Sequence, residues 1–166
     1  MTLKSYNQYN TKLFITLALV LLVLTGCKKG NEFYTDYDEV AYNVFGDNYG
    51  VVDYKRTSKE VKVNLQEEKL DLDKVEDFET NIHHKILDYS EGIQDLKFSQ
   101  VTFTINTSYE DGFGNTYKIN AYEITLTSDT IKELDFNTVN AEDIKNIAEE
   151  YVKNPELEEL GLEEQE

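Results

Sequence analysis

The chain has 166 residues and is strongly acidic, with 33 Asp and Glu residues against 16 Lys and Arg and a formal net charge of −17. A surface of this charge repels phosphate groups, so nucleic acid is excluded as a partner and anionic lipid headgroups should be avoided. The single cysteine, Cys27, leaves no internal disulfide, and the length suits one domain with its own core.

The N-terminus has the pattern of a secretory signal. Lys4 and Lys12 are the only charged residues before Cys27, and the run 13–24 that follows them is uncharged and almost wholly aliphatic. Because a bilayer core needs about 20 apolar residues, this run is too short to span a membrane comfortably. The pattern therefore predicts a signal peptide rather than a transmembrane helix.

The apolar run ends in Leu24-Thr25-Gly26-Cys27, which resembles the lipobox of bacterial lipoprotein signal peptides. The resemblance implies cleavage after Gly26 and diacylation of Cys27, with palmitate as the typical acyl group. Two acyl chains anchor a protein stably where one binds only marginally, so the protein would sit lipid-anchored on the extracytoplasmic face of the cell membrane. The alternatives are an uncleaved signal anchor and a secreted protein with an incidental cysteine. The resemblance covers residues 1–27 only.

The chain divides into four parts on this interpretation. Residues 1–26 are the cleaved signal peptide, 27–32 the lipidated cysteine and a short tether, 33–154 a folded domain, and 155–166 an acidic tail. The tail is rich in glutamate and contains no basic residue, so we expect it to be loose, or at most a frayed turn that uses Leu157 and Leu160.

The first half of the domain shows both helical and strand periodicity. A helix is predicted over 33–45 and should end at Gly46, because its apolar residues share one face: Phe33, Tyr37, Val40, Ala41, Val44 and Phe45. Alternating residues predict strands over 51–54 and 59–65. A second helix is predicted from about Asp71 or Asp73 to 90–92, since apolar residues recur at helical spacing along it.

The second half begins with the clearest strand signal. Alternation over 101–106 and 117–126, with turn residues at 110–115 between them, predicts a β-hairpin. The alternation changes phase at Ala121-Tyr122, which predicts a β-bulge there; a strand buried on both faces is the alternative. A third strand over 130–136 and a helix that begins at Asn140 and is ended by Asn154-Pro155 complete the domain.

The element order α-β-β-α-β-β-β-α has runs of strands rather than strict alternation. It predicts an α+β fold in a single small domain, with an antiparallel sheet of about four to five strands and two to three packed helices. The sequence of the domain itself matches no family motif.

Few residues carry chemistry. Glu79 and His83 lie four apart on the second predicted helix and share a face, but their spacing is not the His-Glu-x-x-His of zinc hydrolases. Asp71, Asp73 and Asp77 resemble the start of a calcium loop, but the glycine and glutamate that an EF-hand needs further along are missing. We therefore expect neither a metal nor another cofactor.

The sequence does not favour an enzyme. Because Cys27 is expected to be acylated and the only two histidines of the chain are adjacent, no nucleophile–base pair can be identified. The many acidic residues leave one alternative open, an envelope hydrolase that uses carboxylates alone. No catalytic residue is assigned.

Tyrosines crowd the start of the domain. Tyr34, Tyr42 and Tyr49 do not fit the buried face of the first helix, and exposed tyrosines are typical of binding surfaces, although packing at the rim of the core would place them equally well. We therefore predict a non-catalytic module at the cell surface that binds a protein or a peptide through Tyr34, Tyr42 and Tyr49. A further alternative is that the stretch 19–26 of the signal peptide is released as an apolar peptide pheromone.

Overall fold

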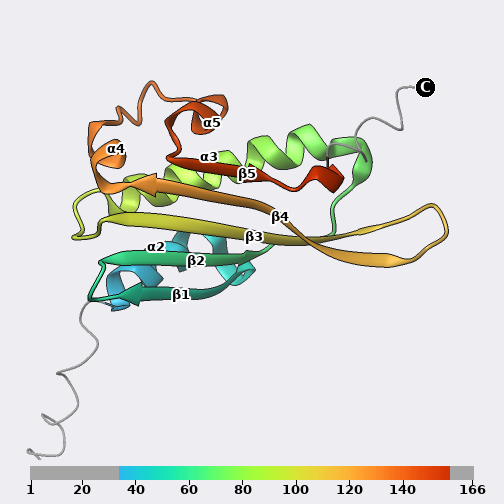
Figure 1. Cartoon of the computed structure of the whole chain (residues 1–166), viewed down its shortest axis with the longest axis horizontal. Coiled ribbons are helices and arrows are strands. Elements are labelled where there is room, and N and C mark those ends of the chain that lie inside the picture. Colours follow the sequence, from blue (N-terminus) through green and yellow to red (C-terminus); the bar gives the residue numbers. More distant parts are fainter. Residues whose placement is uncertain (1–33, 158–166) are drawn as a thin grey trace, which may run out of the picture. The chain divides into compact units, whose positions relative to one another are not determined.

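The computed structural model describes residues 34–157 and has the predicted α+β class in a single small domain (Figure 1). A five-stranded mixed sheet carries helices, and short 3-10 turns (η) join several of the elements. In chain order, the elements are α2 (Tyr34–Phe45), η1 (Gly46–Asn48), β1 (Tyr49–Lys55), β2 (Glu60–Gln66), η2 (Leu72–Lys74), α3 (Val75–Ile93), β3 (Gln100–Glu110), β4 (Thr116–Thr127), α4 (Ser128–Glu133), η3 (Ala141–Asp143), α5 (Ile144–Ile147) and β5 (Glu150–Lys153).

The strand order in the sheet is β1-β2-β3-β4-β5. Neighbouring strands are antiparallel except for β2 and β3, which are parallel. The prediction of a wholly antiparallel sheet is therefore wrong. Its physical reason is α3: a helix between two strands carries the chain back to the end at which it started, so that the next strand runs in the same direction.

The core lies between one face of the sheet and the two long helices. Cross-strand neighbours on that face are apolar, as in the row Val52, Val63, Phe103 and Ile124. Aromatic contacts show that both helices pack there: Tyr37 of α2, Tyr89 of α3 and His83 of α3 contact rings on β1, β3 and β4 respectively. The opposite face carries polar residues such as Lys62 and Thr104, which explains the strict alternation along the strands.

Helix α2 ends where the sequence predicts. Its buried residues Tyr37, Ala41 and Phe45 recur at helical spacing, and Gly46 after them has a φ of 60°, a left-handed conformation that glycine adopts at low cost. Helix α2 lies close to the end of α3, because a Cβ added to Gly92 would lie 2.5 Å from Cγ1 of Val40.

The predicted β-bulge is present in β4. Ile105 pairs with Tyr122 and Asn106 pairs with Asn120, so Ala121 is the extra residue. Both Ala121 and Tyr122 are buried, as the change of phase in the sequence requires.

Two predicted elements after the hairpin are wrong. Most of 130–136 belongs not to a strand but to α4 and the turn after it, because the hydroxyl of Thr127 caps a helix by accepting the N–H of Thr130 at 3.1 Å. The helix predicted from Asn140 up to Asn154-Pro155 stops at Ile147, and Tyr151 lies on β5, which pairs with β4. The observed order therefore has two short helices before the last strand.

The chain stays in contact with the core up to the last described residues. Leu157, in the segment that the sequence assigns to the tail, is buried. The predicted signal peptide, Cys27 and Leu160 lie outside the described residues. Among the helices of residues 34–157, none combines the length and the apolar character needed to cross a membrane.

Candidate functional site

The ionisable side chains with the most internal contacts meet between α3 and the C-terminal segment. Glu79 and His83 project from α3, one helical turn apart, as their spacing predicts. Tyr122 of β4, Lys145 of α5, and Tyr151 and Lys153 of β5 meet them. We call these six residues the Glu79 cluster.

Glu79 is the centre of the cluster and is only 7% exposed. Its Oε2 accepts hydrogen bonds from the Tyr122 hydroxyl at 2.9 Å and from Lys153 Nζ at 3.0 Å, and its Oε1 pairs with Lys145. Burial by itself would raise the pKa of the Glu79 carboxyl, but the hydrogen bonds from Lys145, Lys153 and Tyr122 outweigh it and lower that pKa to about 2. Glu79 is therefore an ionised carboxylate, and both of its oxygens are paired with side chains of the chain itself.

His83 is 2% exposed, and its Nε2 lies 3.1 Å from the Tyr151 hydroxyl. Burial lowers the pKa of the imidazole, and the nearby Glu79 carboxylate only partly opposes this effect. The ring also contacts the rings of Tyr122 and Tyr151 edge-on. A neutral histidine packed among tyrosines in this way fastens β4 and β5 to α3 rather than facing a substrate.

The cluster has the residue types of an acid–base site but the geometry of a structural one. Its carboxylate is closed off by two cations and a hydroxyl, and its histidine is inside the core. Within residues 34–157 there is no group of three or more His, Cys, Asp or Glu side chains that could hold a metal ion.

The three aspartates that resemble a calcium loop do not converge on a common point. The Asp71 side chain accepts the N–H of Asp73 and pairs with Lys74 at 2.9 Å. These contacts cap η2 at the entrance to α3, which is the ordinary role of an aspartate at such a position.

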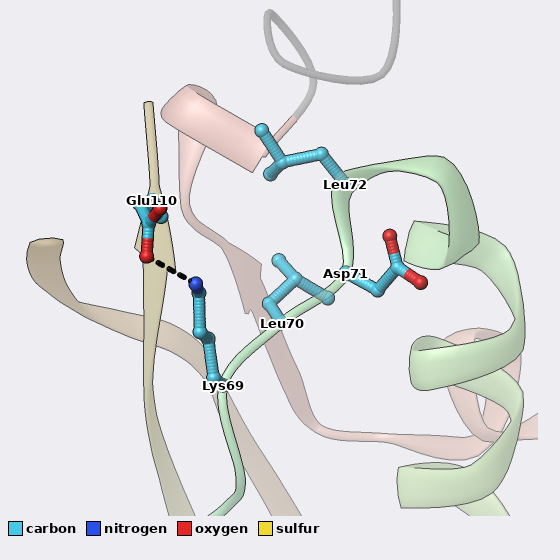
Figure 2. Close-up of a pocket in the computed structure, with 5 residues that line it drawn as sticks. All are labelled: Lys69, Leu70, Asp71, Leu72 and Glu110. Atoms are coloured by element: carbon cyan, nitrogen blue, oxygen red, sulfur yellow. Dashed lines mark hydrogen bonds and ion pairs between the residues drawn. The ribbon is translucent and has the colours of Figure 1, made fainter. Parts of the chain in front are cut away.

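Figure 2 shows a hollow between the end of β3 and the segment that leads into α3. Lys69 reaches across it and pairs with Glu110, while Asp71 points away from that pair. A second hollow shares the 69–71 segment and continues along α3 toward Lys85, which forms an ion pair with Glu67 at 2.9 Å. The lysines that line these two hollows are thus engaged by carboxylates of the chain itself, which satisfies their charge without a ligand.

The three tyrosines of the predicted binding surface have different environments. Tyr42 is 59% exposed on the outer side of α2. Tyr49 begins β1 and is half-buried against the core, and burial together with the Asp38 carboxylate, which accepts its hydroxyl, raises its pKa. Tyr34 is the first residue of α2, and its side chain lies outside the described part. Tyr37 is buried, with its ring stacked on Tyr54 at a centroid distance of 5.3 Å.

Comparison with protein-family models, with curated proteins and with solved structures gives no match for this chain. The residues and their geometry are therefore the evidence for its function.

Sequence reasoning missed two features of the domain. The partners of Glu79 lie 43 and more residues further along the chain, and only the fold brings them together. The other feature is Phe113, which is 93% exposed at the tip of the β3–β4 hairpin and which the sequence assigned only to a turn. An aromatic residue between two glycines in a turn is the signal that could have identified it.

Proposed function

We propose that this chain is a bacterial lipoprotein whose domain binds another protein or a peptide at the cell surface. In this proposal residues 1–26 are removed, Cys27 carries the acyl chains, and the domain stands on the extracytoplasmic face of the membrane. Supporting it are the Leu24-Thr25-Gly26-Cys27 pattern and a domain that begins with α2 a few residues after Cys27.

The observation that carries the binding function is the exposure of Tyr42 beside Tyr49. The two side chains are close enough for their hydroxyls to interact electrostatically, and they lie where α2 passes into β1, an edge strand of the sheet. Tyrosine gives a large contact area at a small cost in conformational entropy, and an edge strand offers unpaired backbone groups to an extended peptide. Asp38 and Asp47 next to the rings favour a partner with basic side chains.

The Glu79 cluster argues for binding over the carboxylate hydrolase. A hydrolase needs a pair of carboxyl groups that face a substrate, one of them with a raised pKa. Glu79, an acidic residue that is only 7% exposed, has a lowered pKa and is held by lysines of the chain itself.

Lipidation is tested by labelling with palmitate in the bacterium. The wild-type protein should incorporate the label, whereas Cys27→Ser should incorporate none and remain unprocessed. Normal cleavage of Cys27→Ser after Gly26 would contradict the lipoprotein assignment.

Binding is tested by comparing partners recovered from detergent-solubilised envelope by wild type, Tyr42→Ala and Tyr49→Phe. Tyr49→Phe keeps the half-buried ring and removes only the hydroxyl, so it should fold normally. Val152→Ala is the matched control, because it truncates an exposed apolar side chain on the other edge strand, β5. A partner that Val152→Ala retains and Tyr42→Ala loses supports the proposal. If folded Tyr42→Ala and Tyr49→Phe both retain every partner, this surface has no binding role.

A further inference from the structure

The tip of the β3–β4 hairpin displays an aromatic side chain to solvent. Phe113 is the most exposed of the large hydrophobic residues in the described domain, and Figure 1 shows the hairpin running beyond the other strands. Single exposed apolar residues are common on protein surfaces and have no meaning by themselves. Phe113 differs from them because the loop that carries it is built around one side chain.

Asp111 organises that loop. Its Oδ1 accepts the backbone N–H groups of Phe113 at 2.9 Å and Asn115 at 2.8 Å, and its Oδ2 accepts the Asn115 side-chain amide at 2.8 Å and the Tyr117 hydroxyl at 3.2 Å. Backbone hydrogen bonds between Asp111 and Asn115 and between Gly114 and Asp111 close the turn. Gly114 has a φ of 86°, which a residue with a side chain adopts only with strain.

The base of the loop is also aromatic. The rings of Tyr109 and Tyr117, which pair across the two strands, stack at a centroid distance of 5.3 Å. The backbone that carries Phe113 is therefore held in place by the hydrogen bonds of the loop. Because that backbone is ordered before binding, less conformational entropy is lost when the aromatic ring enters a pocket, which favours an interface hot spot.

The charges at the tip indicate what kind of surface Phe113 meets. All four donors to Asp111 are uncharged N–H and O–H groups, which satisfy its hydrogen bonds and leave its negative charge in place. The hydrogen bonds from Asn115 are the main cause that lowers the pKa of this carboxyl, so it is ionised at neutral pH. A fixed carboxylate beside Phe113, on a chain with a net charge of −17, opposes insertion into an anionic membrane and favours a basic protein surface.

We propose that the β3–β4 hairpin tip is a docking finger, in which Phe113 enters an apolar pocket of a partner protein and Asp111 faces basic side chains at the rim of that pocket. This surface is separate from the Tyr42–Tyr49 surface, since the hairpin tip and α2 are well apart in Figure 1. It adds a second contact to the proposed binding function and rests on that function.

The test uses the full-length lipoprotein in its own bacterium, with the photo-crosslinking residue benzoylphenylalanine in place of Phe113. Val152 on β5, also exposed, is the control position. We expect one discrete protein adduct from position 113 and none from position 152. An adduct with lipid, the same adduct from both positions, or no adduct at position 113 would overturn the inference.

The crosslinked protein is then purified, and its affinity for full-length variants is measured. Phe113→Ala should weaken binding by about 30-fold or more, as loss of a hot-spot residue does. Phe113→Leu should retain part of the affinity, because leucine fills more of the pocket than alanine does. Asp111→Ala should also weaken binding, because the loop must then be ordered by the partner. Melting temperatures should show that all three variants stay folded. Unchanged affinity of Phe113→Ala would refute the role of the hairpin tip in docking. If Tyr42→Ala nevertheless abolishes binding, the proposed function stands without a contribution from the hairpin tip.

Discussion

Replacing Glu79 by Gln tests the interpretation of the Glu79 cluster as a structural ion-pair network. Gln has nearly the same shape but no charge, so Lys145 and Lys153 lose their partner while the core stays filled. The carboxyl pKa falls from 4.5 to about 2 on folding, and each pKa unit corresponds to about 1.4 kcal/mol. Because Lys145 is half-exposed and therefore screened by water, we expect Glu79→Gln to lower the free energy of unfolding by about 2 to 3 kcal/mol at pH 7.

The same shift sets a pH dependence with a definite sign. A carboxyl whose pKa is lowered in the folded state adds stability that is complete above its unfolded pKa of 4.5 and is lost as the pH falls toward the folded value of about 2. About half of this contribution should be gone by pH 3. The difference between wild type and Glu79→Gln should therefore shrink between pH 5 and pH 2, because the protonated wild type comes to resemble the variant.

The assay is urea unfolding of both proteins at several pH values. Glu76→Gln is the matched control, since Glu76 is an exposed acid one turn earlier on α3. It removes the same charge from the same helix and should change the free energy of unfolding by less than about 0.5 kcal/mol. A loss below about 0.5 kcal/mol for Glu79→Gln at pH 7 would refute a stabilising role of the ion pairs of Glu79. A loss of equal size at pH 7 and pH 3 would refute its electrostatic origin.

Three further predictions concern the core and the surface. Tyr37→Ala should lower the free energy of unfolding, measured with urea, by about 3 kcal/mol or more, because the ring is buried. Tyr42→Ala should lower it by less than about 0.5 kcal/mol, because that ring is exposed. Similar losses for the two variants would mean that both rings belong to the core. Gly92→Ala should lower the free energy of unfolding by about 1 kcal/mol, because the added Cβ would meet the Val40 side chain. In the same assay, adding Val40→Ala to the Gly92→Ala variant should remove this loss. If the losses of the two single variants simply add in the double variant, the contact is contradicted. A strong chelator should leave the melting temperature of the full chain unchanged, because Asp71 is satisfied by Lys74 and the backbone, and a large drop would reveal a bound cation.

The fold was predictable from sequence wherever one face of an element is buried along its whole length. The spacing of Tyr37, Ala41 and Phe45 in α2 and the phase change at Ala121-Tyr122 each reflect such a face. Tyr151 shows where this reasoning fails. It lies four residues after Ile147, which fits a helix, but its place on β5 depends on pairing with Ile124 of β4, and local periodicity carries no information on such pairing.

The direction of β3 was predictable in principle. A long helix between β2 and β3 implies a parallel pair, and both strands and the helix were identified from sequence. The Glu79 cluster was not predictable, because its lysines look like any other surface lysines until the C-terminal segment folds onto α3. The exposure of Tyr42 followed from helical spacing, whereas the half-burial of Tyr49 depends on its packing against the core, which local spacing does not indicate.

The strands stand in the sheet in the same order as in the chain, and this has a consequence for assembly. A polypeptide delivered from its N-terminus, by a ribosome or through a membrane pore, can add each new strand to the free edge left by the strand before it. No strand has to be inserted between two that have already paired, so no finished ladder must open again. The growing edge moves from β2 to β3 to β4 and ends at β5, the last edge strand, whose Lys153 then pairs with Glu79 and holds it to α3. Vectorial synthesis and the layout of the sheet thus favour the same folding order, with few long-lived unpaired edges along the way.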